Sequence, residues 1–176
     1  MVFSFSKRAT CPIYLGKCLI GNARKTTKMS NDLAKLYSTR LLALAADIPH
    51  VGRLEAPQAT VRERAPLCGS TVTVDMDIED DRVQHFAQDV KACALGQAAA
   101  AVVGANIIGC THAQIARAKR ELAAFLKENG PVPAAPFDGF EALLPARDYK
   151  NRHASILLAI TAADQAFAQA AEKDCA

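Results

Sequence analysis

The first patterned segment of the chain, residues 33–44, has a helical spacing of apolar residues. Apolar residues recur at steps of three and four between Leu33 and Leu44. This period predicts a helix that begins at Asn31 or Asp32 and ends before Pro49.

Three segments with strand patterns follow, at positions 58–65, 71–78 and 83–90. The middle segment alternates strictly, which predicts one buried face and one solvent-facing face. Its apolar positions are Val72, Val74, Met76 and Ile78. The charged residues 79–82 form the expected turn, so the second and third segments should pair as an antiparallel hairpin.

The period then returns to about 3.6 residues. The segment Cys93–Ile108 is rich in alanine and almost free of charge, so we expect a central helix, with Leu95, Ala98, Val102 and Ala105 on one face. Thr111 and Gln114 have the spacing of a capping box ahead of a surface helix that stops at residues 129–131. The apolar stripe of that helix is Ile115, Ala118, Leu122, Phe125 and Leu126.

The last third predicts two further helices. A short one is expected around Phe140–Leu144, followed by a final helix. The stripe of the final helix is Ile156, Ile160, Ala163, Phe167 and Ala170. A helix, three antiparallel strands and then a helical layer packed on them is an α+β order.

Composition is consistent with one globular domain. The chain has 176 residues, 51% hydrophobic, with a mean hydropathy of +0.05, which is enough to bury a core. The longest uncharged stretch, 92–116, contains amides and three glycines, so we expect no membrane span.

Charge is distributed unevenly. Positions 1–28 contain six basic residues and no acidic residue. The rest of the chain therefore has 15 of the 21 Lys and Arg residues, against 18 Asp and Glu residues. With no Trp and no basic stripe, the body gives no support for nucleic-acid binding. We interpret 1–28 as a flexible tail or a wrongly assigned start before Met29, with an organelle transit peptide as the alternative, and 29–176 as the domain.

Three potential soft ligands fall at predicted element ends. The six cysteines are irregularly spaced, which favours a reducing, cytoplasmic setting over a disulfide framework. Cys68 lies in the bend between the first two strands, Cys93 begins the central helix, and His153 lies near the start of the last helix. A helix N-terminus favours thiolate, so Cys93 is the expected thiolate. The other cysteines and histidines are interpreted as structural or surface residues.

Three ordered motifs carry a family resemblance over about Leu36–Ala170. They are Pro66-Leu67-Cys68-Gly69, then Cys93-Ala94-Leu95-Gly96-Gln97-Ala98-Ala99-Ala100, then His153-Ala154-Ser155-Ile156-Leu157. Together they resemble the NifU/IscU/SufU-type iron-sulfur cluster scaffolds (the NifU N-terminal-like domain), whose fold has the same element order. The resemblance implies a scaffold that binds iron or a transient cluster and passes it on.

The chain departs from the family pattern at two ligand positions. Ser70 stands where the family has Asp, and Ala154 stands where it has a third cysteine. The ligands implied by the resemblance are therefore Cys68, Cys93 and His153. Asp148 is a possible fourth ligand, although an ordinary N-cap of the last helix is the preferred interpretation of this residue.

The resemblance also implies partners and alternatives. Cys93 is the candidate acceptor of persulfide sulfur from a cysteine desulfurase, with downstream acceptor proteins receiving the cluster. A zinc-binding SufU-like sulfur acceptor is one alternative, and a degenerate binding or regulatory module without metal is another. A Cys93/His153 hydrolase would need a substrate-binding motif that the sequence lacks, so we expect a carrier and no enzyme.

Overall fold

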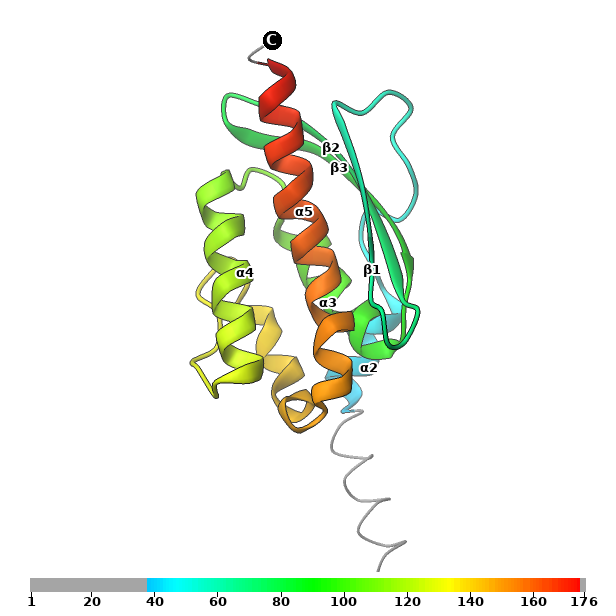
Figure 1. The fold of residues 1–176 in the computed structure, drawn as a ribbon, viewed down its shortest axis with the longest axis vertical. Coiled ribbons are helices and arrows are strands. Elements are labelled where there is room, and N and C mark those ends of the chain that lie inside the picture. Colours follow the sequence, from blue (N-terminus) through cyan, green and yellow to red (C-terminus); the bar gives the residue numbers. More distant parts are fainter. Residues whose placement is uncertain (1–37, 175–176) are drawn as a thin grey trace, which may run out of the picture.

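Residues 38–174 are described by the computed structural model, and they form a three-stranded sheet with helices packed against it (Figure 1). The elements are α2 (Thr39–Ala46), β1 (Ala59–Arg64), β2 (Thr71–Glu79), β3 (Arg82–Lys91), α3 (Ala94–Asn106), α4 (His112–Lys127), the 3₁₀ helices η1 (Asp138–Asp148) and η2 (Lys150–Arg152), and α5 (His153–Asp174). This order confirms the predicted α+β class. The segment 1–28 lies outside the described residues.

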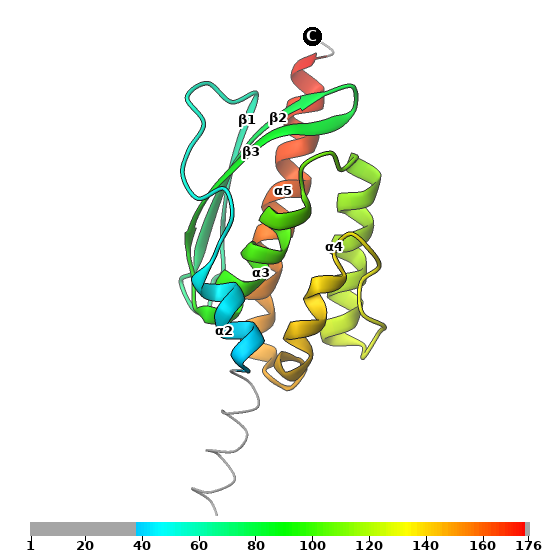
Figure 2. The ribbon, with the colours of Figure 1, turned by 180° about the vertical axis from the view of Figure 1, so that it is seen from behind.

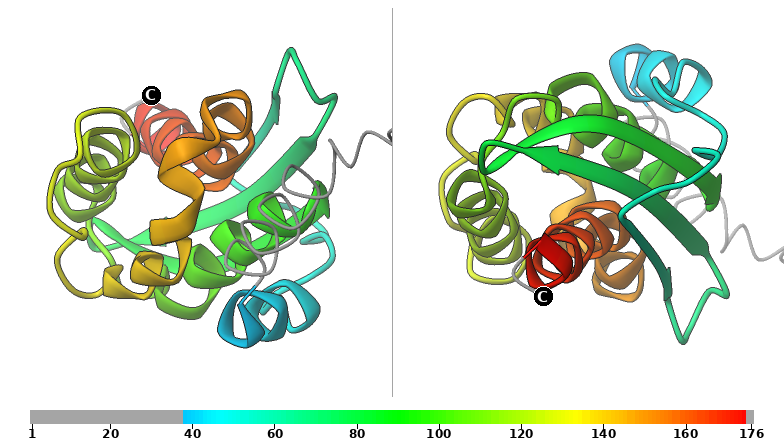
Figure 3. Two further views of the ribbon diagram at one scale, coloured as in Figure 1. Left: turned by 90° about the horizontal axis from the view of Figure 1, so that it is seen from below. Right: turned by 90° about the horizontal axis from the view of Figure 1, so that it is seen from above.

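The predicted hairpin is present and sets the sheet topology. The strand order is β1-β2-β3, and both neighbouring pairs are antiparallel. Asp80 and Asp81 have positive φ angles of 49° and 58°, the backbone that a two-residue hairpin turn needs to match the strand twist. Seen from above and below, the sheet curves around α5 (Figure 3).

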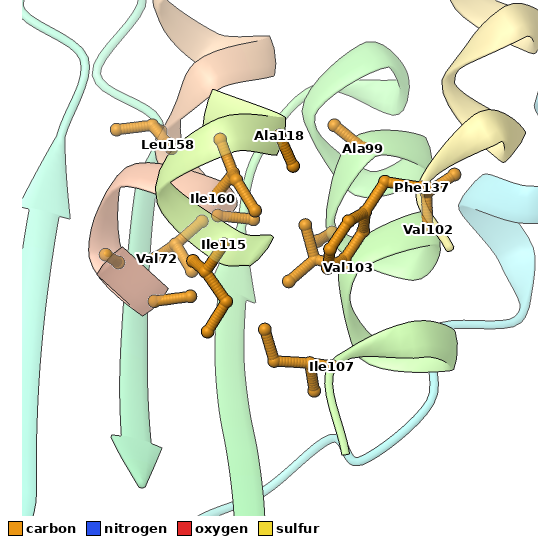
Figure 4. Packing of buried hydrophobic residues seen from close by; sticks show 14 of the residues in the cluster. Val72, Ala99, Val102, Val103, Ile107, Ile115, Ala118, Phe137, Leu158 and Ile160 are labelled. Carbon is orange, nitrogen blue, oxygen red and sulfur yellow. The ribbon is translucent and has the colours of Figure 1, made fainter. Parts of the chain in front are cut away.

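The inner face of β2 forms the core, as its alternation predicted. Val72, Val74 and Met76 are fully buried and Ile78 nearly so. They face α5, which packs on β1, β2 and α3, while α4 lies beyond α3 and α5 on the side away from the sheet (Figures 1 and 2). Figure 4 shows residues from these layers meeting, among them Val72, Val103, Ile107, Ile115, Phe137 and Ile160.

The outer face of β2 differs from the prediction of a solvent-facing side, because Asp75 has no exposed surface. The segment after α2 covers it: Arg53 donates from Nε and Nη2 to the carboxylate at 2.5 and 2.9 Å, and the Leu54 N–H donates at 3.1 Å. Thr60 Oγ1 donates at 2.7 Å. Burial alone raises the pKa of Asp75, but these hydrogen bonds outweigh it and hold the pKa below its ordinary value.

The helices agree with the predicted stripes, with corrections at their ends. α2 begins at Thr39, because Ser38 has extended backbone and its Oγ accepts from the Leu41 N–H; Asn31 and Asp32 lie outside the described residues. The capping box of Thr111 is present. All five predicted stripe residues of α4, and all five of α5, are buried. On α3, Ala105 is exposed and does not belong to the buried face.

The connection into α5 is built from 3₁₀ turns, which corrects the predicted role of Asp148. The expected short helix at 140–144 is part of η1, which contains Pro145 and ends at Asp148. The N–H of Arg152 then donates to the Tyr149 carbonyl within the next tight turn, η2. Asp148 is therefore separated from α5 by η2 and does not cap it.

One stretch of the described chain, 150–173, is long and apolar enough to cross a membrane by length and composition. More than half of its most apolar window is buried inside the fold. It packs against β1, β2, α3 and α4. A central helix of a folded domain has this composition for the same reason, since it is covered on most sides.

Candidate functional site

Three element boundaries meet at one end of the molecule, the lower end in Figures 1 and 2. They are the β1–β2 loop with Cys68, the start of α3 at Cys93, and the start of α5. The loop is closed by hydrogen bonds from the Ala65 N–H to the Ser70 carbonyl and from the Gly69 N–H to the Ala65 carbonyl. Gly69 has a φ of +71°, which a residue without a Cβ adopts at low cost.

Cys93 is the N-cap residue of α3. Its backbone is extended, with φ −67° and ψ 166°, and its carbonyl accepts from the Gln97 N–H at 2.9 Å. Cys68 and Cys93 are both free thiols of intermediate exposure. The sequence therefore placed both cysteines correctly at element ends.

Two buried serines connect the thiols. The Cys68 thiol donates to Ser70 Oγ at 3.2 Å, and Ser155 Oγ donates to the same oxygen at 3.1 Å. Cys93 Sγ lies 3.5 Å from Ser155 Oγ. Ser70 and Ser155 are only 5% and 1% exposed. Folding thus brings the two sulfurs, from distant parts of the chain, to the two ends of one short hydroxyl chain.

A glycine in α3 permits this approach. A Cβ on Gly96, one turn after Cys93, would lie 2.7 Å from Ser155 Oγ and 3.1 Å from the Ser155 carbonyl oxygen. Any larger residue at 96 must move α5 or Ser155. The position of Ser155 beside Cys93 therefore depends on the absence of a side chain at 96.

The electrostatic surroundings favour thiolate at Cys68. The hydrogen bond with the Ser70 side chain lowers the pKa of Cys68 most, against an opposing effect of burial. The Ser70 backbone, the Ser155 hydroxyl and the positive charge of Arg152 lower it further. Cys110 shows the contrast: burial raises its pKa, and its thiol donates to the Asn106 carbonyl. This fits the structural interpretation of Cys110.

His153 is also buried, but its ring contacts backbone carbonyls and not the two serines that connect the thiols. Its Nε2 lies 2.9 Å from the Arg147 carbonyl oxygen and 3.3 Å from the Ala146 carbonyl oxygen. Because both partners accept, Nε2 is the nitrogen that donates, and Nδ1 is the nitrogen left for other contacts. A backbone carbonyl on the second ring nitrogen is the arrangement that orients metal-binding histidines.

The structure joins Cys68 and Cys93 but does not gather them with His153 into a ligand set. Across residues 38–174, no group of three or more His, Cys, Asp or Glu side chains is placed to hold a metal ion. Asp148 is exposed at the end of η1, and Ala154 is half-buried beside a pocket. Metal ligation by Cys68, Cys93 and His153 remains a prediction.

Two contributors to this site were missed at the sequence level. Ser70 was noted only as a departure from the family's Asp, and Ser155 only as part of a motif. Each lies within two residues of a predicted ligand position, and a small polar residue close to a candidate ligand is a signal that hydroxyl bonding is available. Gly96, at helical spacing from Cys93, is the corresponding signal for close helix packing.

Comparison with known proteins agrees with the fold and the motifs. The model of the NifU-like N terminal domain family matches residues 36–155. A NifU-like protein (N-terminal) from Brucella abortus, described as nitrogen-fixing, is similar in structure, with 41% identity, a TM-score of 0.78, and coverage of 81% of this chain and 99% of that one.

A more distant structure shares the fold alone. It is a candidate iron-sulfur cluster assembly scaffold protein for the SUF system from Fervidobacterium islandicum AW-1, with 18% identity and a TM-score of 0.67. The alignment covers 76% of this chain and 98% of that one. Nothing among curated proteins matches this sequence.

Proposed function

Because this chain belongs to the NifU-like N-terminal domain family, we propose that it is a scaffold for iron-sulfur cluster assembly. It receives iron and sulfur as cargo and passes them to acceptor proteins. The observation that carries the proposal is the chain of contacts Cys68–Ser70–Ser155–Cys93, which holds two thiols at one end of the fold.

A site with only two protein thiols suits transient binding. Iron in a sulfide cluster takes thiolate ligands most readily, and nitrogen, oxygen or external ligands make the site more labile. In this proposal Cys68 and Cys93 bind the cargo and His153 supplies a nitrogen. Asp148, an external thiol or a partner completes the set. A scaffold needs that lability because it must release what it assembles.

Sulfur arrives as a persulfide in this proposal. The thiolate of the chain attacks the outer sulfur of a cysteine persulfide on a desulfurase; a new S–S bond forms, the old one breaks, and the desulfurase cysteine leaves as thiolate. Cys93 is the acceptor expected from its place at a helix start. The lowered pKa of Cys68 makes this thiol the competing acceptor.

The role is that of a cytoplasmic carrier. Its partners are a cysteine desulfurase, which delivers sulfur, and the acceptor proteins that take the finished cluster. The chemistry that breaks the carbon-sulfur bond of cysteine belongs to the desulfurase. This chain contributes binding, orientation and release.

Anaerobic reconstitution with ferrous iron and sulfide tests the proposal. Wild type is compared with Cys68→Ser and Cys93→Ser, and with Cys110→Ser as a matched control, since Cys110 is a buried thiol with its own carbonyl partner. We expect bound iron to fall in the first two variants and to stay unchanged in the control. Equal iron in all four proteins would contradict the site, and zinc in the protein as purified would replace iron as its metal.

A further inference from the structure

The outer face of the sheet carries basic residues where it reaches the Cys68 loop (residues 65–70). The last two rows across β1, β2 and β3 before this loop are Arg62-Thr73-Asp89 and Arg64-Thr71-Lys91. Directly paired residues of an antiparallel sheet lie on the same face. Thr71 and Thr73 alternate along β2 with the apolar residues that pack under α5, so both rows lie on the outer face. Three basic side chains and one carboxylate therefore occupy this part of the sheet.

The excess positive charge resides on β1. Lys91 Nζ contacts the Asp89 carboxylate at 3.2 Å, and this ion pair neutralises one of the three cations. Arg62 and Arg64 are both exposed, and within residues 38–174 neither takes part in an ion pair. The two free guanidinium groups therefore lie on the strand that leads into the Cys68 loop.

The Cys68 loop presents an apolar side chain to solvent. Leu67 is 78% exposed, more than any other large hydrophobic residue of the described chain. Backbone hydrogen bonds between Ala65 and both Gly69 and Ser70 close the loop, so Leu67 and Cys68 share one tight turn. A single exposed leucine is common on protein surfaces, but this one lies beside a free thiol and a basic strand. A partner that covers it gains from apolar burial, and the closed loop keeps the cost of ordering low.

The opposite end of the sheet is acidic. The β2–β3 turn contains the exposed residues Glu79, Asp80 and Asp81, and it lies at the upper end in Figure 1, away from the thiols. The basic residue of this turn, Arg82, donates from Nη1 to the Gly109 carbonyl. Opposite charges at the two ends orient the molecule as it approaches a charged surface. An acidic surface is therefore attracted to the end of the sheet that carries Cys68.

We propose that Arg62, Arg64 and Leu67 form the docking surface for a cysteine desulfurase, and that this partner presents carboxylates around an apolar contact. The inference rests on the proposed function, because it assigns the surface on which the sulfur donor of that function sits. A standard interface covers about 800 Å² on each partner, a patch roughly 30 Å across. A protein seated on Leu67 and the two arginines therefore also covers the loop that holds Cys68.

Two observations select this partner. The sulfur donor must meet a thiolate of this chain directly, and Cys68, whose pKa the Ser70 hydrogen bond lowers, lies in the same loop as Leu67. A nucleic acid fits the face less well, because Asp89 stands among the cations and the two rows contain no aromatic residue for base stacking.

Binding kinetics of the full chain with the cysteine desulfurase of the source organism test the proposal, at low and at high salt. Arg62→Glu and Arg64→Glu should each slow association by roughly threefold to tenfold at low salt and much less at high salt, because salt screens the attraction. Leu67→Ala should speed dissociation by roughly tenfold at either salt concentration, because it removes apolar contact area.

Two matched controls lie away from the proposed surface. Arg120 is an exposed residue of α4 that forms no ion pair within the described part of the chain, and Ile108 is an exposed apolar residue after the far end of α3. Arg120→Glu and Ile108→Ala should leave both rates unchanged. Wild-type rates in the test variants, equal losses in the controls, or no binding of the desulfurase to wild type would overturn the proposal. A desulfurase that binds all variants alike, while the arginine variants lose self-association or binding to duplex DNA, would also overturn it and assign the face to a second copy or to nucleic acid.

Iron reconstitution separates this inference from the proposed function. Arg62→Glu, Arg64→Glu and Leu67→Ala should bind iron as wild type does, because dissolved sulfide needs no protein donor. If Cys68→Ser and Cys93→Ser lose iron while the desulfurase binds every variant alike, the scaffold function stands and only the docking surface is refuted. If the two cysteine variants keep full iron while the arginine and leucine variants lose the desulfurase, the scaffold site is refuted and the docking surface stands.

Discussion

Replacing Gly96 by alanine tests the close packing of α3 on α5. The new Cβ would lie 2.7 Å from Ser155 Oγ, 2.8 Å from Ala92 Cβ and 3.1 Å from the Ser155 carbonyl oxygen. The hydroxyl can rotate, but rotation breaks its bonds to Ser70 and Cys93. The other two atoms are fixed to the backbone, so α5 at Ser155 and the segment before α3 at Ala92 must both shift.

The expected cost is the balance of two effects. Overpacking in a tight interface destabilises by about 1–3 kcal/mol, whereas alanine in place of glycine favours a helix by up to about 1 kcal/mol. We therefore expect Gly96→Ala to lower the free energy of unfolding by about 1–2 kcal/mol. Urea unfolding followed by circular dichroism measures this free energy, and its dependence on urea concentration should be the same as in wild type.

Two companion variants identify the cause. Ala105→Gly changes an exposed position of α3, so its cost of about 1 kcal/mol reports helix propensity alone. Ser155→Ala in the Gly96→Ala background removes the nearest clashing atom and should recover part of the loss, which a double-mutant cycle isolates. A Gly96→Ala protein more stable than wild type, with alkylation of Cys93 unchanged, would refute the packing argument.

Three other substitutions give distinct results. Asp75→Asn should lower the free energy of unfolding by about 2 kcal/mol at neutral pH, because a buried, charge-assisted network is lost. The pKa of Asp75 is depressed in the folded protein, so the extra stability of wild type should be lost as pH falls below about 4. The thermal unfolding temperatures of the two proteins should then converge. Ser70→Ala removes the main cause of the lowered pKa of Cys68, so alkylation of Cys68 followed by mass spectrometry should need a higher pH; an unchanged profile would contradict that cause. Thr111→Ala breaks the capping box of α4 and should cost about 1 kcal/mol in chemical unfolding, while a cost near zero would show that the cap is redundant.

The fold was largely predictable because its signals are local. The alternation from Val72 to Ile78 and the capping box at Thr111 depend on residues close in sequence, and both appear as expected. The error at Asp75 arose because the segment around Arg53 covers it from outside the sheet, and that segment has no periodic pattern. Asp148 was misassigned because 3₁₀ turns have no amphipathic signature that distinguishes them from a helix start.

The site was predictable only in part, since its geometry depends on tertiary contacts. Motif spacing identified Cys68 and Cys93, but the serine link between them joins positions 70 and 155, 85 residues apart. His153 was expected near the thiols, and its bonds to the Arg147 and Ala146 carbonyls follow from the path of η1, which the sequence did not predict.

Cobalt(II) titration tests most directly whether Cys68 and Cys93 form one binding site. Cobalt occupies thiolate and imidazole sites suited to divalent iron or zinc, and its thiolate charge-transfer absorbance scales with the number of sulfur ligands. The account predicts one cobalt per wild-type chain, about half the absorbance in Cys68→Ser and in Cys93→Ser, and no change in Cys110→Ser. Full absorbance in either of the first two variants would contradict it.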